Sequence, residues 1–125
     1  MKDKHSILVV DDQKNIADTV AWILQAAGYT ARPAYDGSAA LAMSREQTPD
    51  LIISDVLMPG INGIELAISA SMEYPRCRIL LFSGQAGSAD MLDEARRRGH
   101  DFELLAKPID PDDLVKKVAD VLAST

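Results

Sequence analysis

Short apolar runs and longer amphipathic stretches alternate along the chain. The apolar runs end at polar or turn-forming residues, as strands that are buried on both faces of a sheet do. They predict strands at residues 6–10, 29–35, 51–55, 78–82 and 102–106. Between them, apolar side chains recur at the three- and four-residue spacing of a helix. This pattern predicts helices at residues 15–27, 38–46, 64–72, 88–98 and 111–122.

Strands that alternate with helices in this way are joined by right-handed crossovers, which build a parallel sheet with helices on both faces. We therefore expect an α/β fold, a doubly wound sheet of five parallel strands flanked by five helices. A length of 125 residues is that of one ordinary domain. Because no repeat or linker interrupts the alternation, we expect a single domain over residues 1–125.

Composition and charge exclude several classes of protein. Thirteen basic and nineteen acidic side chains give a net charge of −6, which is opposite to the charge of a nucleic-acid binder. The single cysteine, Cys77, cannot form an internal disulfide, so a reducing cytoplasm is expected. No signal-peptide pattern is present, and no run approaches the roughly 18 apolar residues of a membrane span. We expect a cytoplasmic protein that contacts neither nucleic acid nor membrane.

Chemically active residues follow the predicted strands at the point where each one ends. They are Asp11 and Asp12, Asp55, Ser83, and Lys107. In a doubly wound sheet, ligands bind at the carboxyl ends of the strands. Three acids that meet there repel one another unless cations balance them. Lys107 supplies one charge, and Mg²⁺, which prefers oxygen ligands, can supply the rest.

The same residues stand in a familiar pattern: Val10-Asp11-Asp12, Asp55-Val-Leu-Met-Pro-Gly60, Ser83-Gly84 and Lys107-Pro108. In this order and at these separations, the pattern resembles the receiver domain of bacterial two-component response regulators, over essentially the whole chain. The resemblance implies a flavodoxin-like sheet with strand order 2-1-3-4-5.

The resemblance also implies a function. Asp55 would accept a phosphoryl group from a phosphohistidine on a sensor histidine kinase or phosphotransfer protein. Ser83 and Lys107 would contact the phosphoryl oxygens, and the bond before Pro108 would be cis. The resulting change of conformation would control a downstream partner or an effector domain.

The metal site and the kinase contacts are implied in the same way. Asp11, Asp12 and Asp55, with the backbone carbonyl of Leu57, would hold Mg²⁺. Kinase contacts would fall on one face of the helix at 15–27, which carries Asn15, Thr19 and Trp22. For Trp22 a second interpretation stays open, in which the ring only covers neighbouring apolar surface.

Two positions bear on the output and on the lifetime of the phosphoryl group. The position three before Lys107, usually Tyr or Phe, is Leu104. We therefore expect the phosphorylation signal to pass through the loop at 83–88 and the helix that follows it. Leu57 has no group to orient a hydrolytic water, whereas the amide of Gln85 could do so. We expect slow to intermediate self-dephosphorylation.

Two other functions remain to be weighed. A Mg²⁺-dependent phosphohydrolase that used Asp55 as its nucleophile would need an acid two residues later, where this chain has Leu57. We therefore expect a signalling domain that assists its own phosphorylation and dephosphorylation rather than an enzyme. An interaction module independent of phosphorylation would have lost part of the site, and no part is lost. The receiver could be free-standing or part of a longer regulator.

Overall fold

The computed structural model describes residues 5–84 and 88–123. Within them, five strands form one sheet: β1 (Ser6–Val10), β2 (Thr30–Ala34), β3 (Leu51–Asp55), β4 (Arg78–Ser83) and β5 (Glu103–Ala106). The helices between and after them are α1 (Lys14–Ala26), α2 (Gly37–Glu46), α3 (Gly63–Glu73), α4 (Ser88–Arg97) and α5 (Pro111–Ala123). Each expected element is present, with ends that differ by no more than one residue.

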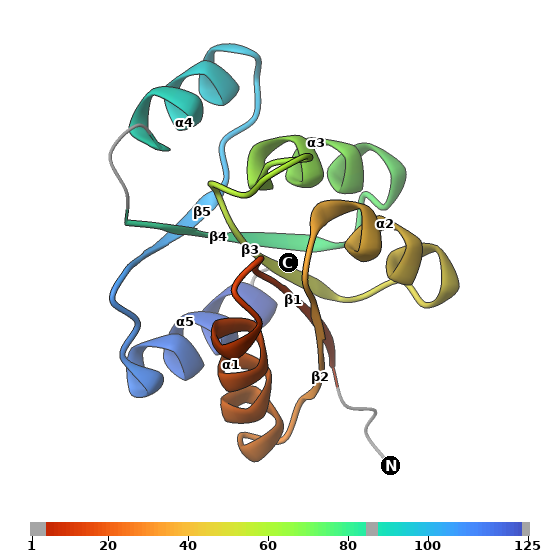
Figure 1. Ribbon diagram of the computed structural model, residues 1–125, viewed down its shortest axis with the longest axis vertical. Coiled ribbons are helices and arrows are strands. Elements are labelled where there is room, and N and C mark those ends of the chain that lie inside the picture. The colour runs from red at the N-terminus through yellow and green to blue at the C-terminus, as the bar shows by residue number, and fades with distance from the viewer. Residues whose placement is uncertain (1–4, 85–87, 124–125) are drawn as a thin grey trace.

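All neighbouring strands are parallel, in the order β2-β1-β3-β4-β5, which confirms the predicted topology. Helices α1 and α5 cover one face of the sheet, and α2, α3 and α4 lie on the other (Figure 1). No helix within the described ranges has the length and apolar character needed to cross a membrane.

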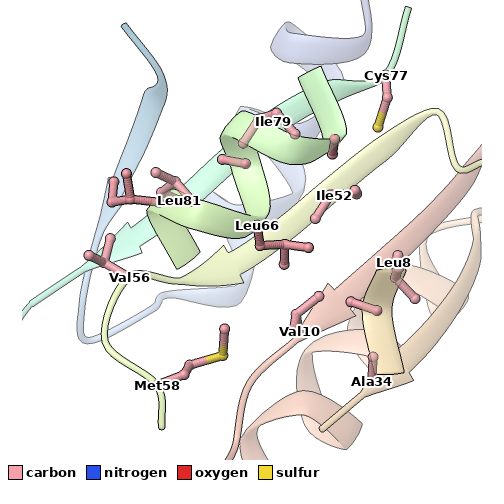
Figure 2. Close-up of a cluster of buried hydrophobic side chains, with 14 of the residues drawn as sticks. Leu8, Val10, Ala34, Ile52, Val56, Met58, Leu66, Cys77, Ile79 and Leu81 are labelled. Atoms are coloured by element: carbon pink, nitrogen blue, oxygen red, sulfur yellow. The ribbon is translucent and has the colours of Figure 1, made fainter. Parts of the chain in front are cut away.

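The sheet separates two apolar cores, because successive side chains of a strand point to opposite faces. Leu8, Ile52 and Leu81 pack toward α2, α3 and α4, in the cluster that Figure 2 shows. Ile53 and Phe82 pack toward α1 and α5 instead. Both β1 and β3 are buried along their whole length, which explains why they appear in the sequence as continuous apolar runs.

The loop after β3 is held close to the end of the strand. A Cβ atom at Gly63 would overlap the carbonyl oxygen of Asp55, so only glycine fits there. The next helix begins with a capping box. The Asn62 side chain accepts a hydrogen bond from the backbone N–H of Glu65 at 2.9 Å, and the Glu65 side chain accepts one from the backbone N–H of Asn62 at 3.2 Å. This arrangement fixes the course of the chain directly after Asp55.

Candidate functional site

Three carboxylates meet at the carboxyl end of the sheet. Asp11 and Asp12 directly follow β1, and Asp55 is the last residue of the neighbouring strand β3. One oxygen from each lies within 4.8 Å of the others. Asp11 and Asp55 are buried and Asp12 is exposed. Consecutive residues can converge in this way because β1 has already ended at Val10.

Lys107 lies against these acids. Its ammonium nitrogen is 3.2 Å from Asp55 Oδ2 and 3.6 Å from Asp11 Oδ2. The amide nitrogen of Lys107 donates to the Ser83 carbonyl at 3.2 Å, so the turn after β5 is anchored to the end of β4. The peptide bond between Lys107 and Pro108 is cis, as expected. One ammonium group therefore faces two buried carboxylates.

One carboxylate oxygen of Asp11 is buried without a hydrogen bond. Its Oδ1 accepts a hydrogen bond from the backbone amide of Gln13 at 3.0 Å, but its buried Oδ2 has no hydrogen-bond partner. Burial raises the pKa of Asp11, although the Gln13 amide and Lys107 both act to lower it. A buried oxygen that lacks a partner, in a group of carboxylates, fits a hard divalent cation.

Ser83 ends β4, and its hydroxyl forms a hydrogen bond with the hydroxyl of Ser88 at 2.9 Å. Ser88 is buried and is the first residue of α4. Two serines five residues apart do not by themselves indicate this pair in the sequence. The sequence also assigned no role to Gly84, where an added Cβ would lie only 2.6 Å from the Cβ of Lys107.

A cavity of about 320 Å³ lies beside Lys107, between α1 and the turn after β5. Asn15 and Thr19 line it from α1, and Pro108 and Ile109 line it from the turn. Trp22 is not among the lining residues, and its side chain is 69% exposed. Two of the three predicted contact residues therefore border the site directly, and the third stands free on the same helix.

The residues expected to govern lifetime and output are Leu57, Gln85 and Leu104. Leu57 is half-buried and packs against the apolar core between the sheet and α2, α3 and α4, which we call the α3 core. Gln85 lies outside the described residues. Leu104 is 37% exposed and pairs with Leu81 in the sheet. Phe102 packs against the α3 core and stacks on His100, with ring centroids 6.0 Å apart.

Among curated proteins, the chain is similar to the nitrogen assimilation regulatory protein NtrX of Azorhizobium caulinodans, with 35% identity over 113 residues. It is also similar to the DNA-binding response regulator MtrA of Mycolicibacterium smegmatis, with 31% identity over 117 residues. The matches cover 89% and 92% of this chain, but only 24% and 49% of those relatives. The chain thus spans a quarter to a half of their length.

A solved structure of similar size also matches. The Vibrio cholerae chemotaxis protein CheY4 superimposes with a TM-score of 0.84 and 34% identity, over 95% of this chain and 99% of that one. The model of the response regulator receiver domain matches residues 7–119. These residues include all of the sheet except Ser6, and the complete group of acids, serine and lysine at its end. The chain belongs to the response regulator receiver domain family.

Proposed function

We propose that Asp55 accepts a phosphoryl group in a Mg²⁺-dependent reaction, from a phosphohistidine on a sensor histidine kinase or phosphotransfer protein. The observation that supports this most strongly is the Lys107 ammonium, 3.2 Å from the Asp55 carboxylate and close to Asp11. Receiver domains are signalling domains, and this chain has their acidic site. The phosphorylated domain then controls a downstream partner or an effector domain.

The transfer forms one bond and breaks one bond. A carboxylate oxygen of Asp55 bonds to phosphorus, while the bond from phosphorus to the donor's histidine nitrogen breaks. Charge is spread over the equatorial phosphoryl oxygens in the transition state, so catalysis depends on positioning and on neutralising that charge. Lys107 already lies where it can do so. The Ser83 hydroxyl can donate a hydrogen bond to one of the same oxygens.

The groups that we propose as Mg²⁺ ligands are the carboxylates of Asp11, Asp12 and Asp55 and the backbone carbonyl of Leu57. The Oδ2 of Asp11, which is buried without a hydrogen-bond partner, and the convergence of the three carboxylates support this donor set. When bound, Mg²⁺ supplies the positive charge that one lysine cannot provide for three acids and a phosphoryl group.

We infer that the chain assists its own phosphorylation and dephosphorylation and does not turn over a separate substrate. Leu57 occupies the position where a phosphohydrolase with an Asp55 nucleophile would need its acid. It is half-buried against apolar side chains of the α3 core and has no proton to transfer. Hydrolysis of the aspartyl phosphate is then slow enough for the modified state to persist as a signal.

The kinase docks, in this proposal, along α1 and the turn after β5. The cavity there shares Lys107 with the acidic site, so a partner that fills it brings its phosphohistidine next to Asp55. Asn15 and Thr19 offer polar contacts on its α1 wall. Trp22 adds an exposed ring, and tryptophan is enriched at interface hot spots.

Three further points concern the bounds of the domain, its contacts and its location in the cell. Residues 1–125 would act as one receiver domain, because a single sheet accounts for the described elements. The net charge of −6 supports a domain without direct contact to nucleic acid or membrane. The cytoplasm is the proposed location, since Cys77 is a free, buried thiol whose pKa burial raises to about 12.

Incubation with acetyl phosphate tests the function without a kinase. We expect intact-protein mass spectrometry to show one added phosphoryl group in the presence of Mg²⁺. It should be labile to hydroxylamine, as an acyl phosphate is. Asp55→Asn should abolish the labelling and Lys107→Ala should slow it. Labelling that survives a chelator, or that survives Asp55→Asn, would contradict the proposal.

A further inference from the structure

The hydrogen bond between Ser83 and Ser88 joins the site to α4. Its two hydroxyl oxygens are 2.9 Å apart, and Ser88 is only 3% exposed. The bond is partly buried, with its Ser88 end inside the protein, where loss of a hydrogen-bond partner has an energetic cost. An inference about its role rests on the phosphoacceptor function proposed above.

The strand pattern places the Ser83 side chain toward α4. In β4, Ile79 and Leu81 belong to the core under α3 and α4, and Ser83 follows them at the next alternate position. In β3, Leu51 and Ile53 belong to the opposite core, and Asp55 follows them. The hydroxyl that should bind a phosphoryl group on Asp55 is therefore engaged on the side of the sheet away from it.

Ser88 forms a large part of the attachment of α4. The helix is mostly polar, and its buried residues are Ser88, Leu92 and Ala95. Figure 1 shows α4 at one end of the layer that α2 and α3 form. A helix held by so few buried groups responds strongly when one of them changes partner.

We propose that Ser88 is a positioning residue that holds the Ser83 hydroxyl in the unphosphorylated state, and that phosphorylation of Asp55 exchanges this partner for the phosphoryl group. Either hydroxyl can be the donor in this bond, but the Ser83 side chain cannot point toward Ser88 and toward Asp55 at once, and its hydroxyl has a single proton to donate. Once Ser83 turns and donates that proton to a phosphoryl oxygen, its bond to Ser88 is lost and the first turn of α4 is released. The signal thereby reaches α4 without a ring at position 104.

Removing the Ser88 hydroxyl should have an effect opposite to that of general damage to α4. A modification shifts a conformational equilibrium only through contacts that differ between the two states. Because the bond between Ser83 and Ser88 exists in the unphosphorylated state alone, removing it favours the phosphorylated state. Ser88→Ala should therefore strengthen the binding of a phosphoryl mimic, whereas general damage to α4 would weaken it.

A double-mutant cycle tests this with beryllofluoride and Mg²⁺, followed by amide chemical shifts. The cycle compares the wild type, Ser88→Ala, Ser83→Ala and the double variant. We expect Ser88→Ala to bind beryllofluoride about two- to tenfold more tightly than the wild type, the range that one neutral hydrogen bond gives. In the Ser83→Ala background the gain from the lost bond should disappear, because contacts of Ser88 with other groups enter both backgrounds equally and cancel in the cycle.

Ser44→Ala is the matched control. It removes a buried hydroxyl from α2, where Ser44 donates to the Ala40 carbonyl at 2.8 Å, and should leave the affinity unchanged. If Ser88→Ala does not fold, Ser88→Cys replaces it with the same expected direction, since a thiol is a weak donor and acceptor. Weaker or unchanged binding, or an equal gain in both backgrounds, would overturn the inference. A wild type that binds no beryllofluoride would instead overturn the phosphoacceptor function itself.

Discussion

Gly84 and Lys107 approach each other so closely that a side chain at position 84 would displace the lysine. A Cβ atom built on Gly84 lies 2.6 Å from the Cβ of Lys107, well inside van der Waals contact. The far end of the same lysine is 3.2 Å from Asp55. The missing side chain at position 84 thus helps to determine where the ammonium group lies.

Gly84→Ala should slow phosphorylation by acetyl phosphate. The backbone at Gly84 is not in the left-handed region, so alanine adds no conformational strain and acts only by pushing on Lys107. Since a displacement of about 1 Å in a reacting group can cost a hundredfold in rate, we expect a decrease of roughly ten- to a hundredfold. The measurement is the initial rate of labelling by intact mass.

Gly28→Ala provides the comparison for that variant. Gly28 has φ +103° and open space around its Cβ position, so the substitution strains the backbone without touching the site. It should lower the melting temperature and leave the labelling rate unchanged. An unchanged rate in Gly84→Ala would show that Lys107 reaches Asp55 independently of position 84.

Asp11→Asn should stabilise the protein in the absence of Mg²⁺. Burial raises the pKa of Asp11 above its ordinary value of 3.8, so the folded state binds its proton more tightly than the unfolded state. The folded state then loses stability as the pH rises through that pKa. Asparagine carries no charge and keeps an oxygen for the Gln13 amide. We expect calorimetry in chelator at neutral pH to show a melting temperature roughly 2 to 5 °C higher.

Two features identify the cause of that gain. It should shrink as the pH falls toward 3.8, where Asp11 becomes protonated in both states. Added Mg²⁺ should raise the melting temperature of the wild type and not that of Asp11→Asn. Asp101→Asn, at an exposed acid, should match the wild type in both respects. A lower melting temperature for Asp11→Asn in chelator would mean that its charge stabilises the site.

Leu57→Asn should shorten the lifetime of the phosphoryl group. An amide at this half-buried position can hydrogen-bond a hydrolytic water, which leucine cannot do. We expect the half-life after removal of acetyl phosphate to fall by about two- to tenfold, the range of a single hydrogen bond. Leu57→Met, which keeps an apolar side chain, should retain the original half-life. A half-life in Leu57→Asn equal to or longer than that of the wild type would refute this assignment.

Trp22→Ala should separate kinase recognition from chemistry. Because the ring is 69% exposed, its loss should leave folding and acetyl phosphate labelling intact while it slows transfer from the cognate kinase. The loss of a hot-spot residue costs about 2 kcal/mol or more of binding, so transfer at low protein concentration should fall by about tenfold or more. Met72→Ala removes an equally exposed side chain, 73%, from α3 and should leave transfer unchanged. Equal losses with both donors would indicate a folding defect instead.

The sequence predicted the fold well because its signals are local. The apolar runs of β1 and β3 are buried on both faces, and their length of five residues is typical of strands and too short for a helix. The candidate site followed from the same reasoning, since parallel strands bring their carboxyl ends together. For this reason the sequence alone is enough to group Asp11, Asp12 and Asp55.

Two contacts beside this site could not be predicted in this way. Ser88 pairs with Ser83 only because α4 begins at the end of β4, and glycine at position 84 matters only because Lys107 is packed against it. Neither relationship has a periodicity or a motif. For Trp22 the local pattern predicted only part of the arrangement. Its spacing from Asn15 and Thr19 predicted a shared helix face, but whether a side chain lines the cavity beside Lys107 depends on packing, and Trp22 does not line it.

The most direct test asks which carboxylate carries the phosphoryl group. Reduction of the labelled protein with borohydride converts an aspartyl phosphate to homoserine, and tryptic peptides then locate it. The peptide from Glu46 to Arg76 contains Asp55, whereas the peptide from His5 to Lys14 contains Asp11 and Asp12. We predict homoserine at position 55 alone, and only in samples that were labelled with Mg²⁺ present. Homoserine in the peptide from His5 to Lys14, or none in either peptide, would contradict the assignment of Asp55 as the phosphoacceptor.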